Sequence, residues 1–367
     1  MPLTFLETLS NADHEQIQFL RDPDLGLFAI VAIHDSQAGP AFGGIRRCVY
    51  PHLVDGLRDV LRLSSAMTDK CALAGIPGGG AKAVVLDRAD LDRDAAYRLL
   101  GRYVENLDGR WFCGPDVGTG ARELALIAES TRFVTVPGSD GPGDLATATA
   151  RGVIAGLEAV AATLQGTERD KAELGRFSYA IQGLGEVGSL LAHELRERGA
   201  RVIASDVDDT RLARAIDQDG IEPCASEEIL AAACDVFVPC ALGGILHDLS
   251  IERLRFRAIC GSANNILATD DHGDLLAQRG VLVAPDFVVN SGALILGAGY
   301  HLFGERDPSA AIDRIGEELL ALFARARSEG LAPTRLAVQI AQERRAAARS
   351  LGAGPFFPHD LNSGGKR

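Results

Sequence analysis

Phe177-Ser-Tyr-Ala-Ile-Gln-Gly-Leu-Gly-Glu-Val-Gly188 is the stretch of this 367-residue sequence that decides its fold. Residues 177–182 form an apolar run typical of a strand, and the spacing after Gly188 predicts a helix through Arg198. Arg201-Val-Ile-Ala-Ser-Asp206 then predicts the next strand. Strand, glycine-rich turn, helix and strand in this order indicate one βαβ unit of a parallel sheet.

The glycines of this turn carry a chemical prediction. A lone Gly-x-Gly-x-x-Gly is a weak signal in a glycine-rich chain, but here it stands between a strand and a helix, and an acid closes the next strand. Gly183 suits a tight turn, Gly185 a close approach to pyrophosphate, and Gly188 the packing of helix on strand. Asp206 can accept both ribose hydroxyls and would repel a 2′-phosphate, so NAD is favoured over NADP. The loop contacts would be Gly183, Leu184, Gly185, Glu186, Val187, Gly188, Asp206 and Val207.

Further βα repeats follow, with strands predicted at residues 236–242, 258–261 and 281–284. Ligands bind beyond the carboxyl ends of the strands in an open parallel sheet, so the next loops would also contact the cofactor. Those contacts would be Cys240, Ala241, Leu242, Ser262, Ala263 and Asn264. Asn264 and Asn265 could equally be turn residues, which is a common use of asparagine. The fold class is therefore α/β, with a doubly wound sheet in the second half.

Met67-Thr-Asp-Lys-Cys-Ala-Leu-Ala-Gly-Ile-Pro-Gly-Gly-Gly-Ala-Lys-Ala-Val-Val85 is the informative stretch of the first half. Lys70 and Lys82 stand in apolar and glycine-rich company, and the glycines 78–80 would let a backbone approach a ligand closely. One interpretation is a substrate pocket with two cationic groups. The other is a surface loop with two solvated lysines.

The remaining elements follow from hydrophobic periodicity. Predicted are strands at 25–33 and 83–86, a glycine-rich turn at 39–46, helices at 53–67, 95–107 and 147–162, and helical spacing over 308–349. Asp92 or Asp94 would cap the helix at 95–107. In the loop 111–120, Asp116 could meet a lysine or cap the next helix, and capping is the commoner role.

A proline- and glycine-rich segment, Val136-Pro-Gly-Ser-Asp-Gly-Pro-Gly143, predicts a domain boundary. Residues 1–138 and 330–367 would form a substrate domain, and residues 139–329 a nucleotide-binding domain. The C-terminal helix would thus return to the first domain.

Bulk composition excludes some classes of function. A formal net charge of −13 argues against nonspecific nucleic-acid binding. The 7 cysteines form no Cys-x-x-Cys or Cys/His pattern, which predicts free thiols, a reducing compartment and no metal site. No apolar run of membrane-spanning length and no leader sequence are evident, so a cytoplasmic protein is expected.

The order of these motifs resembles that of the leucine/phenylalanine/valine dehydrogenases of the Glu/Leu/Phe/Val amino-acid dehydrogenase family, over about residues 14–299. Besides the loop 183–188, the shared motifs are Gly39-Pro-Ala-Phe-Gly-Gly-Ile-Arg46, Met67-Thr-Asp-Lys70, Gly79-Gly-Ala-Lys82, Asp116-Val-Gly-Thr119, Pro239-Cys-Ala-Leu242, Gly261-Ser-Ala-Asn-Asn265, and Ala284-Pro-Asp286 with Asn290-Ser-Gly292. The resemblance implies NAD-dependent, reversible oxidative deamination of an L-amino acid to a 2-oxo acid and ammonia, by a homo-oligomer.

The resemblance also implies residue roles. Lys82 would be the general base that activates water, and Asp116 would handle the amine proton. Lys70 would bind the substrate carboxylate, helped by Gly43, Gly44, Met67 and Asn264, and Thr149 would reach the nicotinamide carboxamide. A base of this kind must titrate near neutrality, which burial beside a second cation favours for a lysine.

Specificity would come from an apolar wall of Phe42, Gly114, Leu294 and Gly297. Gly114 with Leu294 is closer to phenylalanine-specific members than to leucine-specific ones, whereas Phe42 narrows one side. Pro115 departs from the family pattern and could shift Asp116. A glutamate-type enzyme would need a further cation, a hydroxy-acid dehydrogenase a histidine base, and an inactive NAD-binding regulator would have no need of Lys82 and Asp116.

Overall fold

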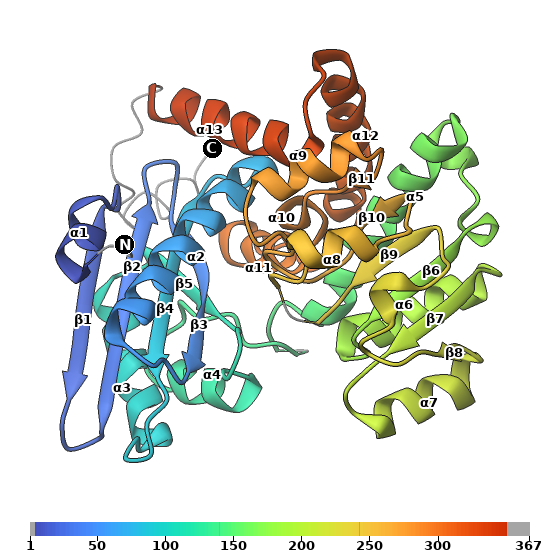
Figure 1. The fold of residues 1–367 in the computed structure, drawn as a ribbon. Coiled ribbons are helices and arrows are strands. Elements are labelled where there is room, and N and C mark those ends of the chain that lie inside the picture. Colours follow the sequence, from blue (N-terminus) through green and yellow to red (C-terminus); the bar gives the residue numbers. More distant parts are fainter. Residues whose placement is uncertain (1–3, 139, 242, 351–367) are drawn as a thin grey trace. The chain divides into compact units, whose positions relative to one another are not determined.

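The structure is a computed structural model that describes residues 4–138, 140–241 and 243–350 (Figure 1). Leu242 and the end of the predicted substrate domain after residue 350 lie outside the described residues. The described chain forms two compact units. Residues 4–143, 300–304 and 341–350 belong to the first unit, and residues 144–299 and 305–340 to the second, apart from the gaps given above.

The first unit contains a five-stranded sheet in the order β1-β2-β4-β3-β5. Its strands are β1 (Gln16–Asp22), β2 (Leu27–Asp35), β3 (Ala41–Cys48), β4 (Gly79–Leu86) and β5 (Trp111–Gly114). β2 pairs antiparallel with β1 and β4, whereas β3 pairs parallel with β4 and β5. β1 was not predicted, because its pairing with β2 leaves its side chains half-exposed and its apolar signal weak.

Helix α2 (Leu53–Leu73) packs along one face of this sheet (Figure 1). Leu57, Val60 and Leu61 of the helix bury Ile30 of β2 and Val84 of β4. The helix continues past its predicted end at Met67, and β4 begins before its predicted start, so Lys70 is helical and Lys82 lies within a strand.

The glycines before Lys82 serve packing between elements. A Cβ on Gly80 would lie 2.3 Å from the carbonyl oxygen of Ser64 and 2.3 Å from the backbone nitrogen of Thr68, both on α2. A Cβ on Gly79 would lie 1.7 Å from the carbonyl oxygen of Asp35. These two glycines let α2 and β2 approach β4, which gives them a packing role that the sequence did not suggest.

Gly80→Ala is expected to destabilise the fold by about 2–3 kcal/mol, because overpacking at a backbone contact forces neighbouring elements apart. Chemical denaturation measures the loss. Gly56→Ala on α2, the helix that Gly80 contacts, is the control, since its added Cβ meets only side-chain atoms at 3.6–3.7 Å. Equal stability of the two variants would contradict this account.

The rest of the first unit consists of α1 (Phe5–Ser10), α3 (Arg93–Asn106), α4 (Ala121–Ala128) and two returning segments. Asp92 caps α3, as one of the two predicted alternatives, by accepting from the backbone N–H of Ala95 at 3.1 Å. The glycine-rich turn predicted at 39–46 is wrong, because most of it is strand β3. In the last returning segment, Arg344 donates to the carbonyl of Leu73 at 2.9 Å and so caps α2.

The second unit contains a six-stranded, all-parallel sheet in the order β11-β10-β9-β6-β7-β8. Its strands are β6 (Ser178–Gln182), β7 (Arg201–Ser205), β8 (Glu222–Pro223), β9 (Val236–Pro239), β10 (Ala258–Ile259) and β11 (Leu282–Val283). Counted within the unit, this is the order 3-2-1-4-5-6 of the doubly wound dinucleotide-binding fold. The predicted fold class is confirmed.

The helices of the second unit are α5 (Leu145–Gln165), α6 (Glu186–Glu197), α7 (Asp209–Asp219), α8 (Asp248–Arg253), α9 (Asp271–Gln278), α10 (Asp286–Val289) and α12 (Ser309–Glu329), with short turns η1 (Arg169–Lys171), η2 (Leu174–Arg176) and η3 (Ile229–Ala231). Two more, α11 (Gly292–Phe303) and α13 (Pro333–Ser350), run from this unit into residues of the first. The helical spacing over 308–349 contains a break, because Gly330 adopts φ +68 and ends α12.

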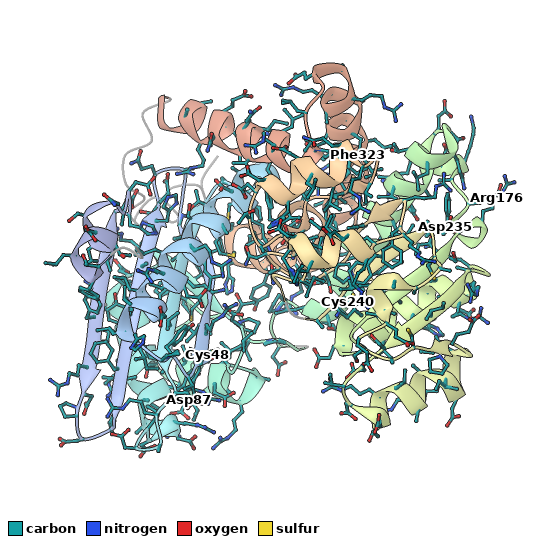
Figure 2. The ribbon with its side chains drawn as sticks, viewed as in Figure 1. Cys48, Asp87, Arg176, Asp235, Cys240 and Phe323 are labelled. Atoms are coloured by element: carbon teal, nitrogen blue, oxygen red, sulfur yellow. The ribbon has the colours of Figure 1, made fainter. Side chains whose placement is uncertain are left out.

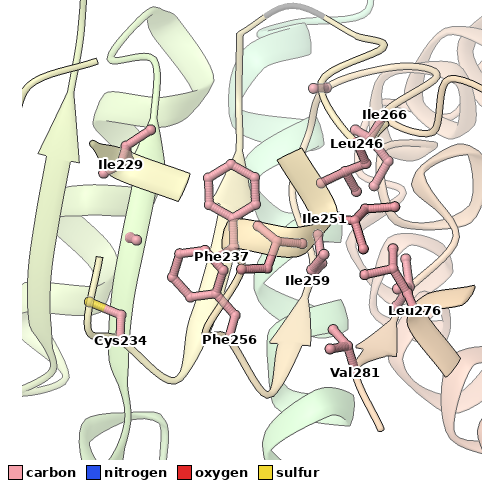
Figure 3. Close-up of a cluster of buried hydrophobic side chains, with 14 residues drawn as sticks. Ile229, Cys234, Phe237, Leu246, Ile251, Phe256, Ile259, Ile266, Leu276 and Val281 are labelled. Atoms are coloured by element: carbon pink, nitrogen blue, oxygen red, sulfur yellow. The ribbon is translucent and has the colours of Figure 1, made fainter. Parts of the chain in front are cut away.

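A cluster of buried apolar side chains fills one side of the second unit (Figure 3). Phe237 of β9 stacks on Phe256 with ring centroids 5.1 Å apart, and residues from β10, α8 and α9 surround the pair. This packing holds β9 and β10, whose following loops belong to the predicted cofactor site.

Helix α5 is the one described helix that is long and apolar enough to cross a membrane, with a mean hydropathy of 1.3. Of that apolar window, 67% is buried within the protein. Gly152 and Gly156 of α5 face Ile315 and Leu319 of α12, where a Cβ would meet their side chains at 2.9 and 3.3 Å. The apolar character of α5 is thus accounted for by a buried helix–helix contact.

Candidate functional site

Lys82 and Asp116 form a buried ion pair in the first unit. The Nζ of Lys82 lies 2.6 Å from Oδ2 of Asp116, and the two side chains are only 8% and 11% exposed. Lys82 is therefore not a solvated surface lysine. Asp116 does not cap the next helix either, since Gly120 occupies that position and donates to Glu123. Of the two predicted alternatives for Asp116, contact with a lysine is the one observed.

The backbone around Asp116 brings its carboxylate to Lys82. A Cβ on Gly44 would lie 2.3 Å from the carbonyl oxygen of Pro115 and 3.0 Å from Cβ of Asp116, so only glycine admits this approach. The backbone N–H of Val117 donates to Oδ1 of Asp116 at 2.7 Å. Pro115 thus does not turn the aspartate away from the lysine.

Arg46 is a third member of the site that the sequence interpretation left without a role. Its Nε and Nη2 donate to the two carboxylate oxygens of Asp116 at 3.2 and 3.3 Å, and its Nη1 donates to Asp59 at 3.0 Å. Arg46 lies two residues after Gly44 in β3, so both face the same side of the sheet. That alternation was a signal from which its place beside Asp116 could have been predicted.

The charges around Asp116 keep it ionised. Burial raises the pKa of the Asp116 carboxyl, but Lys82 and Arg46, together with the hydrogen bond from Val117, outweigh burial and hold that pKa below its ordinary value. The site therefore presents a carboxylate in contact with an ammonium group and a guanidinium, all three mostly buried.

The predicted substrate residues of the first unit lie on β3 and α2, the two elements that pack against the strand bearing Lys82. Gly43 and Gly44 are on β3, and a Cβ on Gly43 would come 3.4 Å from Cγ of Met67 on α2. Lys70 lies one turn after Met67, in the last turn of the same helix. Both Met67 and Lys70 are half-buried. The structure thus places a second lysine on the helix that covers the strand bearing Lys82.

The predicted side-chain wall is aromatic in the first unit. Phe42 stacks on Phe112 with centroids 5.5 Å apart, and Phe112 lies 4.7 Å from the ring of His301. Thr135 lies within hydrogen-bonding distance of His301 Nε2, at 3.0 Å, and opposite Gly114, where a Cβ would meet it at 3.7 Å. Burial lowers the pKa of His301 to about 4, so the ring is neutral at neutral pH. Neither His301 nor Thr135 was singled out from the sequence.

In the second unit, the glycine loop lies where the strand order reverses, between β6 and β9. A Cβ on Gly183 would lie 2.9 Å from Cβ of Ala241, and one on Gly188 would lie 2.0 Å from the carbonyl oxygen of Gly183. Gly185 is the N-cap of α6, with no side-chain cap, and a Cβ there would meet no atom within 4 Å. Tight packing beneath and open space at a helix N-terminus fit a pyrophosphate.

Asp206 is held beside this loop. Its carboxylate accepts from the backbone N–H of Leu184 at 2.6 Å and from that of Asp208 at 2.8 Å. Val207 next to it is 93% exposed. Glu186 is exposed and Val187 half-buried in the first turn of α6. These residues fit the ribose end of a dinucleotide.

The other predicted cofactor contacts occupy the same edge of the sheet. Cys240 and Ala241 follow β9 (Figure 2), and Ser262, Ala263 and Asn264 follow β10. Asn290 supports the second loop, because its Nδ2 donates to Oδ1 of Asn264 at 2.9 Å and to the carbonyl of Ser262 at 3.1 Å. Asn265 adopts φ +52, so the turn interpretation holds for that residue. Asn290 had been assigned no role.

Three predicted residues lie elsewhere in the second unit. Thr149 is on α5 and donates its hydroxyl to the carbonyl of Leu145 at 2.9 Å. Leu294 and Gly297 are on α11, a helix that was not predicted, and so belong to a different unit from Phe42 and Gly114.

Comparison with known proteins identifies similar sequences. Residues 14–133 match the family model described as "Glu/Leu/Phe/Val dehydrogenase, dimerisation domain". Residues 205–298 match the model described as "Glutamate/Leucine/Phenylalanine/Valine dehydrogenase". The chain is 39% identical to a phenylalanine dehydrogenase of Bacillus thermotolerans, over 93% of this chain and 90% of that protein. It is 36% identical to a leucine dehydrogenase of Bacillus cereus, over 95% and 96% of the two chains.

A solved structure is also similar. The crystal structure of L-tryptophan dehydrogenase from Nostoc punctiforme superposes with a TM-score of 0.78 at 33% sequence identity, covering 94% of this chain and 100% of that one. The likeness therefore extends through both compact units.

Proposed function

Since this chain belongs to the glutamate/leucine/phenylalanine/valine dehydrogenase family, we propose that it catalyses the NAD-dependent, reversible oxidative deamination of an apolar L-amino acid. The reaction converts amino acid, NAD⁺ and water to 2-oxo acid, NADH, ammonium and a proton. The observation that carries the proposal is the buried contact of Lys82 with Asp116, because this chemistry needs a base and a proton acceptor shielded from water.

In the proposed mechanism a bound NAD⁺ would supply the acceptor for the hydride that leaves the substrate Cα. Lys70 binds the substrate carboxylate, with backbone groups of Gly43, Gly44 and Met67 beside it. Asp116 takes up the amine proton, and Lys82 then removes a proton from the water that attacks the imine carbon. In the ion pair Lys82 is protonated and its Nζ lies 2.6 Å from Oδ2 of Asp116, so Lys82 must first release that proton to solvent before it can act as the base.

The proposed cofactor contacts are the loop 183–188, Asp206, Val207, the loops after β9 and β10, and Thr149. The support is the uncapped N-terminus of α6 and the open space at Gly185. NAD is proposed over NADP because a carboxylate at Asp206 would accept from the ribose hydroxyls and would repel a 2′-phosphate.

Asp206→Asn is expected to lower the preference for NAD over NADP, as the ratio of their kcat/KM values, by about tenfold or more, because it removes a charged acceptor. The amide oxygen can still accept from Leu184, so the loop is kept. Initial rates with both cofactors measure the ratio. Asp209→Asn, an equal charge change in the first turn of α7, is the control, and a ratio that moves equally in both variants would refute the assignment.

The proposed substrate is phenylalanine or another bulky apolar amino acid. The stacked rings of Phe42 and Phe112 support it, as does similarity to enzymes named phenylalanine and leucine dehydrogenases. A methylene in such a pocket changes specificity by only about 1–3 kcal/mol, so several amino acids would be accepted. A glutamate-type enzyme is the second candidate, and it would need a cation near the wall.

The experiment that tests the function follows the absorbance of NADH with a panel of L-amino acids and NAD⁺. Turnover with phenylalanine, leucine and valine is expected. Turnover with glutamate as the only substrate would contradict the proposed apolar side-chain pocket. Tight NADH binding without turnover of any amino acid would indicate a regulatory protein instead.

Self-association and a cytoplasmic location are further parts of the proposal. The match of residues 14–133 to a model described as a dimerisation domain supports a homo-oligomer. All 7 cysteines are free, which suits a reducing compartment.

A further inference from the structure

Within the first unit, a series of side chains with alternating charges begins at Lys82. Lys82 contacts Asp116, Asp116 contacts Arg46, and Arg46 contacts Asp59, with N–O distances of 2.6, 3.2 and 3.0 Å. Asp59 also accepts from the hydroxyl of Tyr50 at 2.7 Å. Arg46 and Asp59 are 18% and 16% exposed, so these contacts lie mostly out of water. The proposed function uses the first pair and leaves the rest of the series unexplained.

We propose that Arg46 is a positioning residue for the deamination: it orients the Asp116 carboxylate and keeps it ionised when Lys82 has lost its proton, while Asp59 and Tyr50 hold Arg46 in place. The inference rests on the proposed function. It adds a residue that contacts neither substrate nor cofactor in that proposal.

The geometry supports the orienting part of this role. Arg46 gives one donor to each oxygen of Asp116, and such a two-pronged contact fixes the plane of a carboxylate. Lys82 and the backbone N–H of Val117 each hold one oxygen of Asp116. The side chain of Arg46 contacts both of them. Asp59 accepts from the remaining nitrogen of Arg46 and from Tyr50, so the guanidinium is itself fixed from β3, α2 and the segment between them.

Charge balance supports the ionising part. Lys82 must be neutral to accept a proton, and at that moment it no longer stabilises the negative charge of Asp116. Burial then raises the pKa of Asp116, whereas Arg46 lowers it and stays charged throughout. Without Arg46, the buried Asp116 carboxylate would bind a proton more readily once Lys82 is neutral. A protonated Asp116 could no longer accept the amine proton.

Other titratable groups surround this series. Lys82 on β4 faces Asp116 directly, and Asp59 faces Arg46. Asp59 also pairs with Arg62 and accepts from Tyr50. Cys48 on β3 and Asp87 after β4 are farther members of the same electrostatic environment (Figure 2). Lys70 adds a cation on α2. Of these, Arg46 is the group that contacts Asp116 through both of its oxygens.

Arg46→Gln and Arg46→Lys test the inference through the pH dependence of kcat. Loss of the positive charge raises the pKa of Asp116, so the acid limb of the Arg46→Gln profile is expected to move to higher pH by about one unit. Arg46→Lys keeps the charge but not the two-pronged contact, so its limb stays in place while kcat falls. The KM for the amino acid is expected to change less than kcat in both variants.

Arg47→Gln is the matched control, because Arg47 is the next residue of β3 and pairs with Asp87 at 2.8 Å without contacting Asp116. Its acid limb is expected to stay at the wild-type position. A limb that moves equally in Arg47→Gln, or not at all in Arg46→Gln, overturns the role. NADH binding verifies that each variant is folded.

Tyr50→Phe provides a second test if Arg46→Gln does not fold. It removes one hydrogen bond to Asp59, so a smaller shift of the limb in the same direction is expected, and no shift refutes the inference. A wild-type protein without amino-acid turnover would instead refute the proposed function. An active wild type with an unmoved Arg46→Gln limb refutes the role of Arg46 alone.

Discussion

Replacement of Lys82 by alanine is expected to lower kcat for amino-acid oxidation by about a thousandfold, which lies within the range that a general base contributes. The side chain lies in the middle of β4, is buried, and its Nζ is 2.6 Å from Asp116. Bulk water therefore cannot readily take over its function as the general base. The measurement is the initial rate of NADH formation at saturating phenylalanine or leucine.

Two controls define this result. Lys171→Ala removes an exposed lysine that pairs with Glu168 in the second unit, and its kcat is expected to equal that of the wild type. NADH titration of Lys82→Ala is expected to give the wild-type affinity, since the predicted nucleotide loop lies in the other unit. Turnover that survives Lys82→Ala would remove the proposed base.

Asp116→Asn is expected to lower kcat by about a hundredfold, again as the loss of one proton-transferring group. It should also destabilise the protein by about 3–5 kcal/mol at neutral pH, because Lys82 and Arg46 would stay buried without their shared anion. Initial rates and urea denaturation measure the two effects separately.

The stability effect has a definite pH dependence. The pKa of Asp116 is lowered in the folded protein, so its ionised form stabilises the fold above the ordinary carboxyl range, and this contribution is lost as the pH falls through the lowered pKa. The gap in stability between the wild type and Asp116→Asn should therefore narrow in acid. Asp87→Asn, which breaks the comparable pair with Arg47, is the control and should leave kcat unchanged. A wild-type rate in Asp116→Asn would contradict the mechanism.

The second unit was the more predictable part of the fold. Each strand of a parallel sheet is buried on both faces, so β6, β7 and β9 are continuous apolar runs, and glycines mark the turn between β6 and α6. The first unit was harder to predict. Gly79 and Gly80 suggest a loop by composition, yet they are strand residues whose missing side chains admit α2 and β2.

The sequence named two of the three charged residues that meet in the site, Lys82 and Asp116, but gave no role to Arg46. The residues alone left Lys82 open between a pocket and a surface loop and favoured a capping role for Asp116, and only the family resemblance assigned both to catalysis. The structure brings the two side chains into contact. Arg46 was missed because residues 39–46 were interpreted as a turn, so the alternation of side chains along a strand was not applied to them. In the structure Arg46 contacts Asp116, whereas the next residue, Arg47, pairs with Asp87.

The segments 300–304 and 341–350, which belong to the first unit, have a consequence for protein engineering. A chimera that takes its nucleotide half from a relative cannot be made by one fusion after residue 143, because that exchange would also replace His301, which packs on Phe112, and Arg344, which caps α2. Residues 144–299 and 305–340 would have to be exchanged as internal cassettes. Recombination at a single junction would leave residues 4–143 of this chain packed against segments 300–304 and 341–350 from the relative, within one compact unit.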